Sequence, residues 1–294
     1  MKKQMENKNF IFLGLGLLLC FNFVAWSAVF HLVTARPLKV VFLDVGQGDA
    51  AFIEIVGLYQ ILIDGGPGTK VLEKLSEQMP FYDRTIDLVL LTHPEKDHLE
   101  GLVEVLNKYQ VDSVVWTGVL RETAVFEEWQ KALENEKATI KIAKSGQKII
   151  ISKAILNILS PFENLAGVSL KDSNSSSIVS KLSFGQTSFF FTGDIYASEE
   201  KELINKGVDL RADVLKIAHH GSKTSTSEGF LQQVSPQLAV ISVGENNNYG
   251  HPSPETLGRL EKSGAKILRT DENGDITITS DGFNLIINPK AQVE

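Results

Sequence analysis

The chain has 294 residues, of which 43% are hydrophobic and 22% are charged. This length suits one large domain or two small ones, and the hydrophobic content is ample for a sizeable core. The formal net charge of -7 argues against a generic nucleic-acid coat protein. It leaves room for a metal-dependent nuclease, because bound metals supply positive charge at such a site. The single cysteine, Cys20, excludes a disulfide framework and a thiolate metal site.

The N-terminal segment is predicted to be a transmembrane helix. Residues 10–33 contain no Asp, Glu, Lys or Arg. As a helix they would extend about 36 Å, enough to cross a hydrocarbon core of roughly 30 Å. A cleaved signal peptide is the rival interpretation, but its apolar region is normally shorter. Lysines precede the span, and this modest bias favours an N-terminus inside the cytoplasm and a folded domain outside it. The expected organisation is a cytoplasmic N-terminus (1–9), a signal-anchor helix (10–33), a linker (34–39) and a folded domain (40–289).

Short β-rich segments separated by turns begin after Pro37. Three consecutive antiparallel strands are predicted, joined through glycine-containing turns: Leu38–Leu43, Ala51–Ile55 and Gln60–Ile63. Apolar residues then recur at helical spacing in three segments: Val71–Gln78, Leu99–Lys108 and Thr123–Asn135. The apolar run Leu88–Leu91 lies between the first two helices and is predicted to be a buried strand.

The second half of the chain follows the same order as the first. Four strands are predicted first: Lys148–Ile151, Ala154–Leu159, Ser177–Phe184 and Ser188–Phe191. Strands and helices then alternate: Val214–Ala218, Ser227–Val234, Leu238–Ser242 and Pro254–Ser263. Three strands close the chain: Lys266–Arg269, Ile276–Thr279 and Asn284–Ile287. Two mixed sheets packed face to face, with helices outside, would accommodate both halves and bring their loops to one edge.

The most informative motif is Thr92-His93-Pro94-Glu95-Lys96-Asp97-His98, which follows the apolar strand Leu88–Leu91. It places His93, Asp97 and His98 in one short loop at a strand end, where a rigid sheet can direct them to one point. Neutral imidazoles and carboxylates are the ligands that a hydrolytic metal site needs. The alternative is an ordinary loop with a helix N-cap at Asp97 and two surface histidines.

Three further strand-end loops carry similar side chains. Asp194 follows the strand Phe189-Phe190-Phe191, a good position for a carboxylate that bridges two metals. His219 and His220 follow another apolar strand, and adjacent residues there point in different directions. We therefore expect one of the pair to bind metal and the other to face substrate. His251 lies in a fourth loop and is a candidate substrate contact. Each loop has an ordinary structural alternative when taken alone, but together the four indicate a shared metal centre.

Other motif matches are weaker. The stretch Asp44-Val45-Gly46-Gln47-Gly48-Asp49 lacks the Lys-Ser/Thr of a phosphate-binding loop and leads into a strand. The stretch Asp271-Glu272-Asn273-Gly274-Asp275 lacks the spacing of a calcium loop and is predicted to be a hairpin. Ser222 has no strand–elbow–helix context, so a serine nucleophile is not predicted.

In this order the loops resemble the metallo-β-lactamase superfamily, and the run from Leu38 to about Ile278 resembles the extracytoplasmic hydrolase domain of ComEC-type DNA-uptake proteins. The matching motifs are Asp44–Asp49, Leu62–Gly66, Thr92–His98, Thr192–Asp194, Asp213–Lys216, His219–Ser222, Ser225–Ser227, Tyr249–Pro252 and Arg269–Asp271. The resemblance implies an α/β (α+β) fold with a four-layer αββα sandwich, and a metal-dependent hydrolase. By position it implies a set of metal ligands and one residue, Asp64, that orients them. The implied ligands are His93, Asp97, His98, Asp194 and the His219–His220 pair.

The chain departs from the superfamily pattern at two positions. Glu95 stands where the superfamily has a second histidine, and Asn174 is the nearest candidate for a further histidine between the halves. One metal position would then consist mostly of oxygen donors, with Glu95, Asp194 and Asn174 beside His93. Oxygen donors favour Mn²⁺ or Mg²⁺ over Zn²⁺. The expected cofactors are two divalent ions, Mn²⁺ or Zn²⁺, and the alternative is a half-empty site.

The leading hypothesis is a membrane-anchored phosphodiesterase that cleaves extracytoplasmic nucleic acid, such as single-stranded DNA, through a metal-activated water. Asp97 would orient that water and accept a proton, while His220, His251 and Lys223 would stabilise the developing negative charge. A separate DNA-uptake channel protein is the expected partner. Two alternatives stay open: a metallo-hydrolase acting on a lactam, a thioester or a choline phosphodiester, and a non-catalytic binding protein on the same fold.

Overall fold

The computed structural model describes residues 14–27, 37–55, 57 and 59–289. The chain divides into two units at Pro37. In the first unit, residues 14–27 form a helix whose large apolar side chains, such as Phe21 and Trp26, are exposed. Within the described ranges, no helix has both the length and the apolar character needed to span a bilayer. The ends of the predicted span 10–33, the predicted N-terminus 1–9 and the first half of the predicted linker 34–39 lie outside the described residues.

The second unit, Leu38–Glu294, contains two mixed sheets. The first has the order β15-β14-β1-β2-β3-β4-β5-β6. Its strands are β1 (Leu38–Phe42), β2 (Ala51–Ile55), β3 (Tyr59–Ile63), β4 (Thr85–Leu90), β5 (Gln110–Trp116), β6 (Thr139–Ile142), β14 (Ile276–Ser280) and β15 (Leu285–Pro289). Pairing is antiparallel from β15 to β3 and parallel from β3 to β6. The strands β1, β2 and β3 thus pair as predicted.

The second sheet has the order β13-β12-β11-β10-β9-β8-β7. Its strands are β7 (Lys148–Ile151), β8 (Ala154–Ser160), β9 (Val179–Phe184), β10 (Thr187–Phe191), β11 (Val214–Lys216), β12 (Leu238–Ile241) and β13 (Lys266–Arg269). Pairing is antiparallel from β7 to β10 and parallel from β10 to β13. Both sheets therefore end in parallel strands, whose carboxyl ends carry the loops that the sequence singles out.

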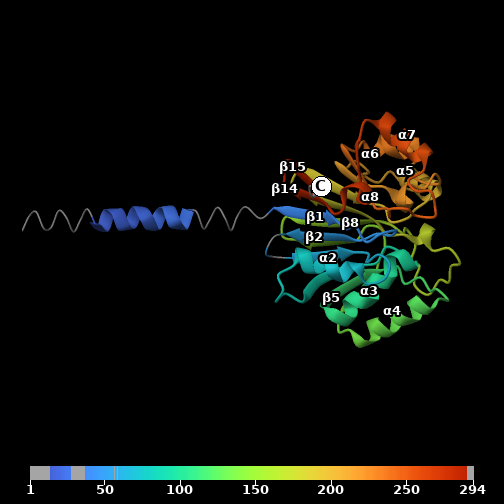
Figure 1. The fold of residues 1–294 in the computed structure, drawn as a ribbon, viewed down its shortest axis with the longest axis horizontal. Helices are drawn as coiled ribbons and strands as arrows, with labels where there is room; N and C mark the ends of the chain where they lie inside the picture. The colour runs from blue at the N-terminus through green and yellow to red at the C-terminus, as the bar shows by residue number, and fades with distance from the viewer. Residues whose placement is uncertain (1–13, 28–36, 56, 58, 290–294) are drawn as a thin grey trace, which may run out of the picture. The chain divides into compact units, whose positions relative to one another are not determined.

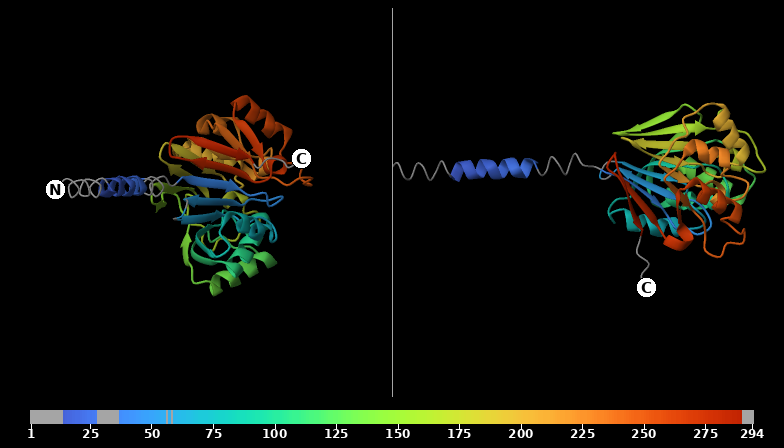
Figure 2. Two further views of the ribbon diagram at one scale, coloured as in Figure 1. Left: turned by 60° about the vertical axis from the view of Figure 1, so that its left-hand side comes forward. Right: turned by 90° about the horizontal axis from the view of Figure 1, so that it is seen from above.

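Helices cover the outer face of each sheet, as Figures 1 and 2 show. The helices on the first sheet are α2 (Lys70–Gln78), α3 (Lys96–Lys108) and α4 (Ala124–Asn135). Those on the second are α5 (Ala197–Asn205), α6 (Glu228–Val234) and α7 (Pro254–Ser263). Short helical turns are η1 (Asn174–Ser176), η2 (Ala218–Gly221) and α8 (Thr270–Asn273).

Three apolar cores hold these layers together. The central core lies between the sheets, where Phe42 of β1 and Phe191 of β10 pack with ring centroids 5.9 Å apart. A second core joins the first sheet to α2–α4 and includes Trp129, and a third joins the second sheet to α5–α7 and includes Phe230. Alternating burial of strand side chains on both faces produces this arrangement. The unit is a mixed α/β sandwich with two sheets, as predicted, in the layer order helix–sheet–sheet–helix.

The structure also corrects parts of the prediction. The segments β5, β6 and α5 were not predicted, and the predicted hairpin at Asp271–Asp275 is largely the short helix α8. The last strands do not extend the second half. They return to the first sheet, where Ile278 of β14 pairs with Val40 of β1.

Candidate metal centre

The predicted metal loop connects β4 to α3 at the carboxyl edge of the first sheet. Asp97 and His98 lie in the first turn of α3, which begins at Lys96. Asp194 follows β10, and His219 and His220 follow β11, at the corresponding edge of the second sheet. Since carboxyl ends of parallel strands in such sheets are where ligand sites form, the topology brings the loops of both halves together.

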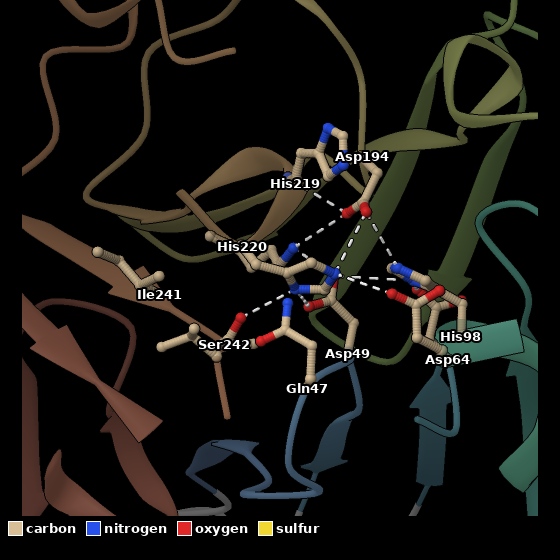
Figure 3. A network of polar contacts seen from close by, with 12 residues as sticks. Gln47, Asp49, Asp64, His98, Asp194, His219, His220, Ile241 and Ser242 are labelled. Carbon is tan, nitrogen blue, oxygen red and sulfur yellow. Dashed lines mark hydrogen bonds and ion pairs between the residues drawn. The ribbon is translucent and has the colours of Figure 1, made fainter. Parts of the chain in front are cut away.

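The two adjacent histidines of η2 have an unusual backbone. His219 has φ 51° and ψ 46°, and His220 has φ 53° and ψ 25°, which is the left-handed region. Each such non-glycine residue costs on the order of 1–3 kcal/mol. The turn makes the two side chains diverge, with their ring planes 73° apart. Figure 3 shows His220 directed into a polar cluster and His219 directed away from it.

Four side chains form the centre of this cluster. The Asp194 Oδ2 atom lies 3.3 Å from His98 Nε2 and 3.3 Å from His220 Nε2. The Asp97 Oδ2 atom lies 3.2 Å from His220 Nε2. The potential ligand atoms of Asp97, His98, Asp194 and His220 all lie within 4.8 Å of one another. Figure 3 shows Asp194 between the two imidazoles.

This cluster fits a metal ion by two criteria. Tetrahedral ligands at bond lengths of about 2.0–2.2 Å are separated from one another by roughly 3.3–3.6 Å, close to the separations measured here. In addition, His98 Nε2 is buried and, apart from the ion-pair contact with Asp194 at 3.3 Å, makes no hydrogen bond, which is costly for a polar atom unless a ligand satisfies it. Asp97, His98, Asp194 and His220 are therefore the residues that would hold a divalent ion.

Both imidazoles are fixed through their other nitrogen. His98 Nδ1 lies 2.8 Å from Asp64 Oδ2, and Asp64 also accepts hydrogen bonds from the backbone N–H (2.8 Å) and hydroxyl (2.7 Å) of Thr92. His220 Nδ1 lies 2.9 Å from the carbonyl oxygen of Ser242. Such contacts fix ring orientation and present Nε2 to a metal. Asp64 thus has the contact that its predicted orienting role requires.

Two residues of the cluster were missed as functional residues, Asp49 and Lys216. Asp49 lies 3.3 Å from His220 Nδ1 and 3.8 Å from His98 Nδ1, and it forms a buried ion pair with Lys216. The Lys216 ammonium also lies 3.7 Å from Asp194 Oδ1. Both residues belong to motifs that support the family resemblance, and a lysine at the end of the apolar strand β11 was the available signal.

The electrostatics of the cluster favour bound cations. Burial alone would raise the pKa of Asp194, but His220 and His98 hold that pKa well below its usual value. Burial alone would lower the pKa of His98 and of His220, but carboxylates led by Asp194 raise both pKa values well above the usual one. Four carboxylates (Asp49, Asp64, Asp97 and Asp194) face one permanent cation, Lys216. Protons on the imidazoles, or a metal ion in their place, must balance this charge.

The predicted second metal position has a different environment. Glu95 forms an ion pair with Arg121, at 2.9 Å from Oε1 to Nη2, and accepts a hydrogen bond from the Ser173 hydroxyl at 2.7 Å. His93 is fully buried beside His98, and burial with the nearby His98 lowers its pKa to about 3, so it is neutral. Among the described residues, neither His93 nor Glu95 belongs to a group of three potential ligand atoms within 4.8 Å. A metal at this position stays a prediction.

A cleft of about 290 Å³ opens above the cluster and is lined by Asp97, Asp194 and His220. His219 and Asn174 also line it, with His219 Nε2 3.4 Å from Asn174 Nδ2. His219 therefore lies on the cleft wall, whereas His220 belongs both to the cluster and to the cleft lining. The metal-binding and substrate-facing roles expected of the pair stay predictions.

The cations of the cleft differ from the prediction. Lys223 is exposed and is not among the cleft-lining residues, while its carbonyl oxygen accepts a hydrogen bond from Arg259. Arg121 and Lys171 line the cleft instead. They come from two loops joined by backbone hydrogen bonds, so they form one wall. His251 also lines the cleft, and its role as a substrate contact stays a prediction.

The protein has a four-layer sandwich, and histidines and aspartates gather where the loops at the carboxyl ends of its two sheets meet. These features define a metal-dependent hydrolase of the metallo-β-lactamase fold. The sequence model of the β-lactamase superfamily domain matches residues 59–215, more than half of the 294 residues. The chain belongs to this superfamily. YhfI of Bacillus subtilis, a metallo-β-lactamase fold protein, has a similar fold, with a TM-score of 0.57 and 14% identity over 83% of this chain and 100% of that one.

Competence proteins are similar to the chain in sequence. It is 32% identical over 255 residues to ComE operon protein 3 of Bacillus subtilis (strain 168), covering 81% of this chain and 32% of that protein. It is 29% identical over 268 residues to recombination protein 2 of Haemophilus influenzae, covering 89% of this chain and 31% of that protein. The chain spans about a third of the length of these relatives. The predicted resemblance to ComEC-type proteins is confirmed.

Proposed function

We propose that this protein is a metal-dependent phosphodiesterase that cleaves nucleic acid. The observation that carries the proposal is the cluster of Asp97, His98, Asp194 and His220 at the base of a cleft whose wall carries Arg121 and Lys171. Carboxylates and imidazoles suit a divalent ion, and cations beside them suit a phosphodiester anion. The similarity to competence proteins supports nucleic acid as the substrate.

Each group has a distinct task in this proposal. A divalent ion in the cluster would supply Lewis acidity and lower the pKa of a water molecule. Asp97 has the most accessible side chain of the four ligands, at 37% exposure against 3% for Asp194, so its carboxylate can orient the attacking water by a hydrogen bond. Burial keeps His98 and His220 fixed on Asp64 and Ser242, which holds the ligand geometry.

The histidines of the cleft would contact the phosphoryl oxygens. Burial lowers the pKa of His219 and of His251, so both are neutral near pH 7 and can donate one hydrogen bond each. Arg121 donates to the carbonyl oxygen of Leu170 at 2.6 Å and pairs with Glu95. Its guanidinium is therefore held in a fixed position on the cleft wall, where its N–H dipoles can face the developing negative charge although Glu95 balances its net charge.

We also propose that residues 10–33 anchor the protein in a membrane with its hydrolase domain outside the cytoplasm, and that a DNA-uptake channel is its partner. The uncharged, exposed apolar helix at residues 14–27 and the competence relatives support this. Carbonate extraction of membranes and protease protection in spheroplasts test it. Release by carbonate, or protection of the domain from external protease, would reject it.

The nuclease activity is tested with the full-length chain in detergent, Mn²⁺ and end-labelled single-stranded DNA. Asp97→Ala and Asp194→Ala should each lower the rate by at least about 10²-fold, as expected when a group that stabilises developing charge is removed. Lys223→Ala is the matched control, because Lys223 lies outside the cleft, and it should cleave like the wild type. Equal product formation by both aspartate variants and the wild type would refute the proposal.

A further inference from the structure

An exposed aromatic side chain lies at the cleft. Tyr249 is 72% exposed, yet it lines the same cleft as Asp97, Asp194 and His220. Its ring is nearly parallel to that of His251, with an interplanar angle of 17° and centroids 5.9 Å apart. This is an offset stack, so one face of Tyr249 is supported by a second ring.

The loop that carries this stack is held rigidly by one side chain, Asn247. Its Nδ2 donates to the carbonyl oxygens of Gly244 (3.1 Å) and His251 (2.7 Å). Its Oδ1 accepts from the backbone N–H groups of Tyr249 and His251, both at 3.1 Å. A side chain with four such bonds fixes the loop, so the Tyr249 ring is positioned before any ligand binds.

The stack is connected to the metal cluster by successive ring contacts. The His251 ring lies 5.8 Å from His219, and the His219 ring lies 6.2 Å from His220. The Tyr249 ring is therefore close enough to the cluster for one oligonucleotide to contact both.

We propose that Tyr249, supported by His251, is a stacking platform for an unpaired nucleobase, and that the substrate class is therefore single-stranded nucleic acid. This rests on the proposed phosphodiesterase function and extends it. Single-strand-binding proteins use aromatic rings in this way, because every base has a π face. In a duplex the bases are stacked and paired, so they cannot reach the ring without being flipped out. A quaternary ammonium group is the other ligand that an aromatic face attracts.

The experiment uses the full-length protein with Mn²⁺ and three substrates: a single-stranded oligonucleotide, the same oligonucleotide with abasic sites, and a phosphorylcholine ester. Tyr249→Ala should raise KM for the first by roughly 5- to 100-fold, the value of one base–aromatic stack, with kcat nearly unchanged. Cleavage of the abasic strand should not change. Tyr249→Phe, which retains the ring, should behave like the wild type.

Tyr82→Ala provides a matched control, because Tyr82 is 75% exposed and is not among the cleft-lining residues. It should leave all three activities unchanged. The platform is refuted if Tyr249→Ala affects the abasic strand as much as the intact one, or impairs only the phosphorylcholine ester.

Binding separates this inference from the proposed hydrolysis. Fluorescence anisotropy of a labelled oligonucleotide, recorded without divalent metal, should show a Kd increase of roughly 5- to 100-fold for Tyr249→Ala only. Equal Kd values for Tyr249→Ala and wild type would refute the platform even if the protein is a nuclease. A wild type that binds through Tyr249 but cleaves no phosphodiester would instead refute the proposed function.

Discussion

The buried ion pair between Lys216 and Asp49 gives the sharpest test of how this site is held together. The two side chains are 5% and 7% exposed, and the ammonium also faces Asp194 at 3.7 Å. The substitution Lys216→Met keeps the length and apolar character of the side chain but removes its charge. Asp49 and Asp194 would then be buried carboxylates without their permanent cation.

The expected cost is large because only one partner is removed. Breaking a buried pair in this way costs about 3–5 kcal/mol, since the remaining charge is uncompensated. Lys181→Met is the matched control. Lys181 pairs with Asp209 at 2.7 Å, but the Asp209 side chain is 76% exposed. Water can solvate Asp209 after the substitution, so the cost there should be at most about 1 kcal/mol.

Urea unfolding of the EDTA-treated protein, followed by circular dichroism, measures both values. The double variant Lys216→Met/Asp49→Asn should be more stable than the sum of the single substitutions predicts, with a coupling of roughly 0.5–3 kcal/mol. Mn²⁺ should stabilise Lys216→Met more than the wild type, because the ion adds the positive charge that the variant lacks. If Lys216→Met costs no more than Lys181→Met, the charge argument for this cluster is wrong.

Three further predictions concern the ligands and the cleft wall. Asp64→Asn should lower Mn²⁺ affinity by roughly 10- to 100-fold in isothermal titration calorimetry, because His98 loses its orienting carboxylate; unchanged affinity would contradict this. The pKa values of His98 and His220 are raised in the folded protein, so both residues stabilise the metal-free fold at pH values below about 6.5, the pKa of histidine in the unfolded chain. This stabilisation is lost as the pH rises through the pKa values that the two residues have in the folded protein. Thermal melts should therefore show a metal-free Tm that falls above about pH 6.5 and a Mn²⁺-induced gain that grows, because metal displaces protons; a gain that is constant with pH would contradict this. Arg121→Lys should destabilise the protein by about 1–2 kcal/mol and expose the cleft wall to limited proteolysis, because lysine lacks the guanidinium group that contacts Glu95 and two carbonyl oxygens. Proteolysis of the variant at the wild-type rate would contradict this.

Local sequence patterns predicted the elements with strong apolar periodicity and failed where periodicity was weak. Strand β5 begins with a mixture of exposed and buried residues, and its continuous buried run is confined to Val114–Trp116. Helix α5 has the sequence ASEEKELIN, in which only Glu200 and Leu203 are buried. The start of this helix is marked by the Glu199 carboxylate, which accepts a hydrogen bond from the backbone N–H of Tyr196 at 3.0 Å, and not by an apolar stripe. The return of β14 to β1 depends on pairing between distant segments, which no local pattern encodes.

For the candidate site, too, the sequence predicted the local features but not the contacts that depend on the tertiary fold. The sequence identified the strand-end loops because parallel strands align their carboxyl ends, and this follows from the order of elements alone. It did not identify which atoms converge. Asp49, in the loop between β1 and β2, meets Lys216 of β11 only because the two sheets pack face to face.

Glu95 stands where the family has a histidine, and its position in the sequence alone does not show whether it binds metal. In the sequence it is an oxygen donor in a metal loop. In the structure its charge is already balanced by Arg121, and its oxygens accept hydrogen bonds from Ser173, which lies 78 positions away. A carboxylate with these partners must lose them before it can bind an ion, so the position with Asp97, His98, Asp194 and His220 should bind metal first. In a stepwise titration with Mn²⁺, the first equivalent should therefore raise the Tm of Glu95→Gln and of the wild type equally, and the two should differ only at higher Mn²⁺. If Glu95→Gln binds the first equivalent more weakly than the wild type, Glu95 belongs to the position that fills first and this reasoning is wrong.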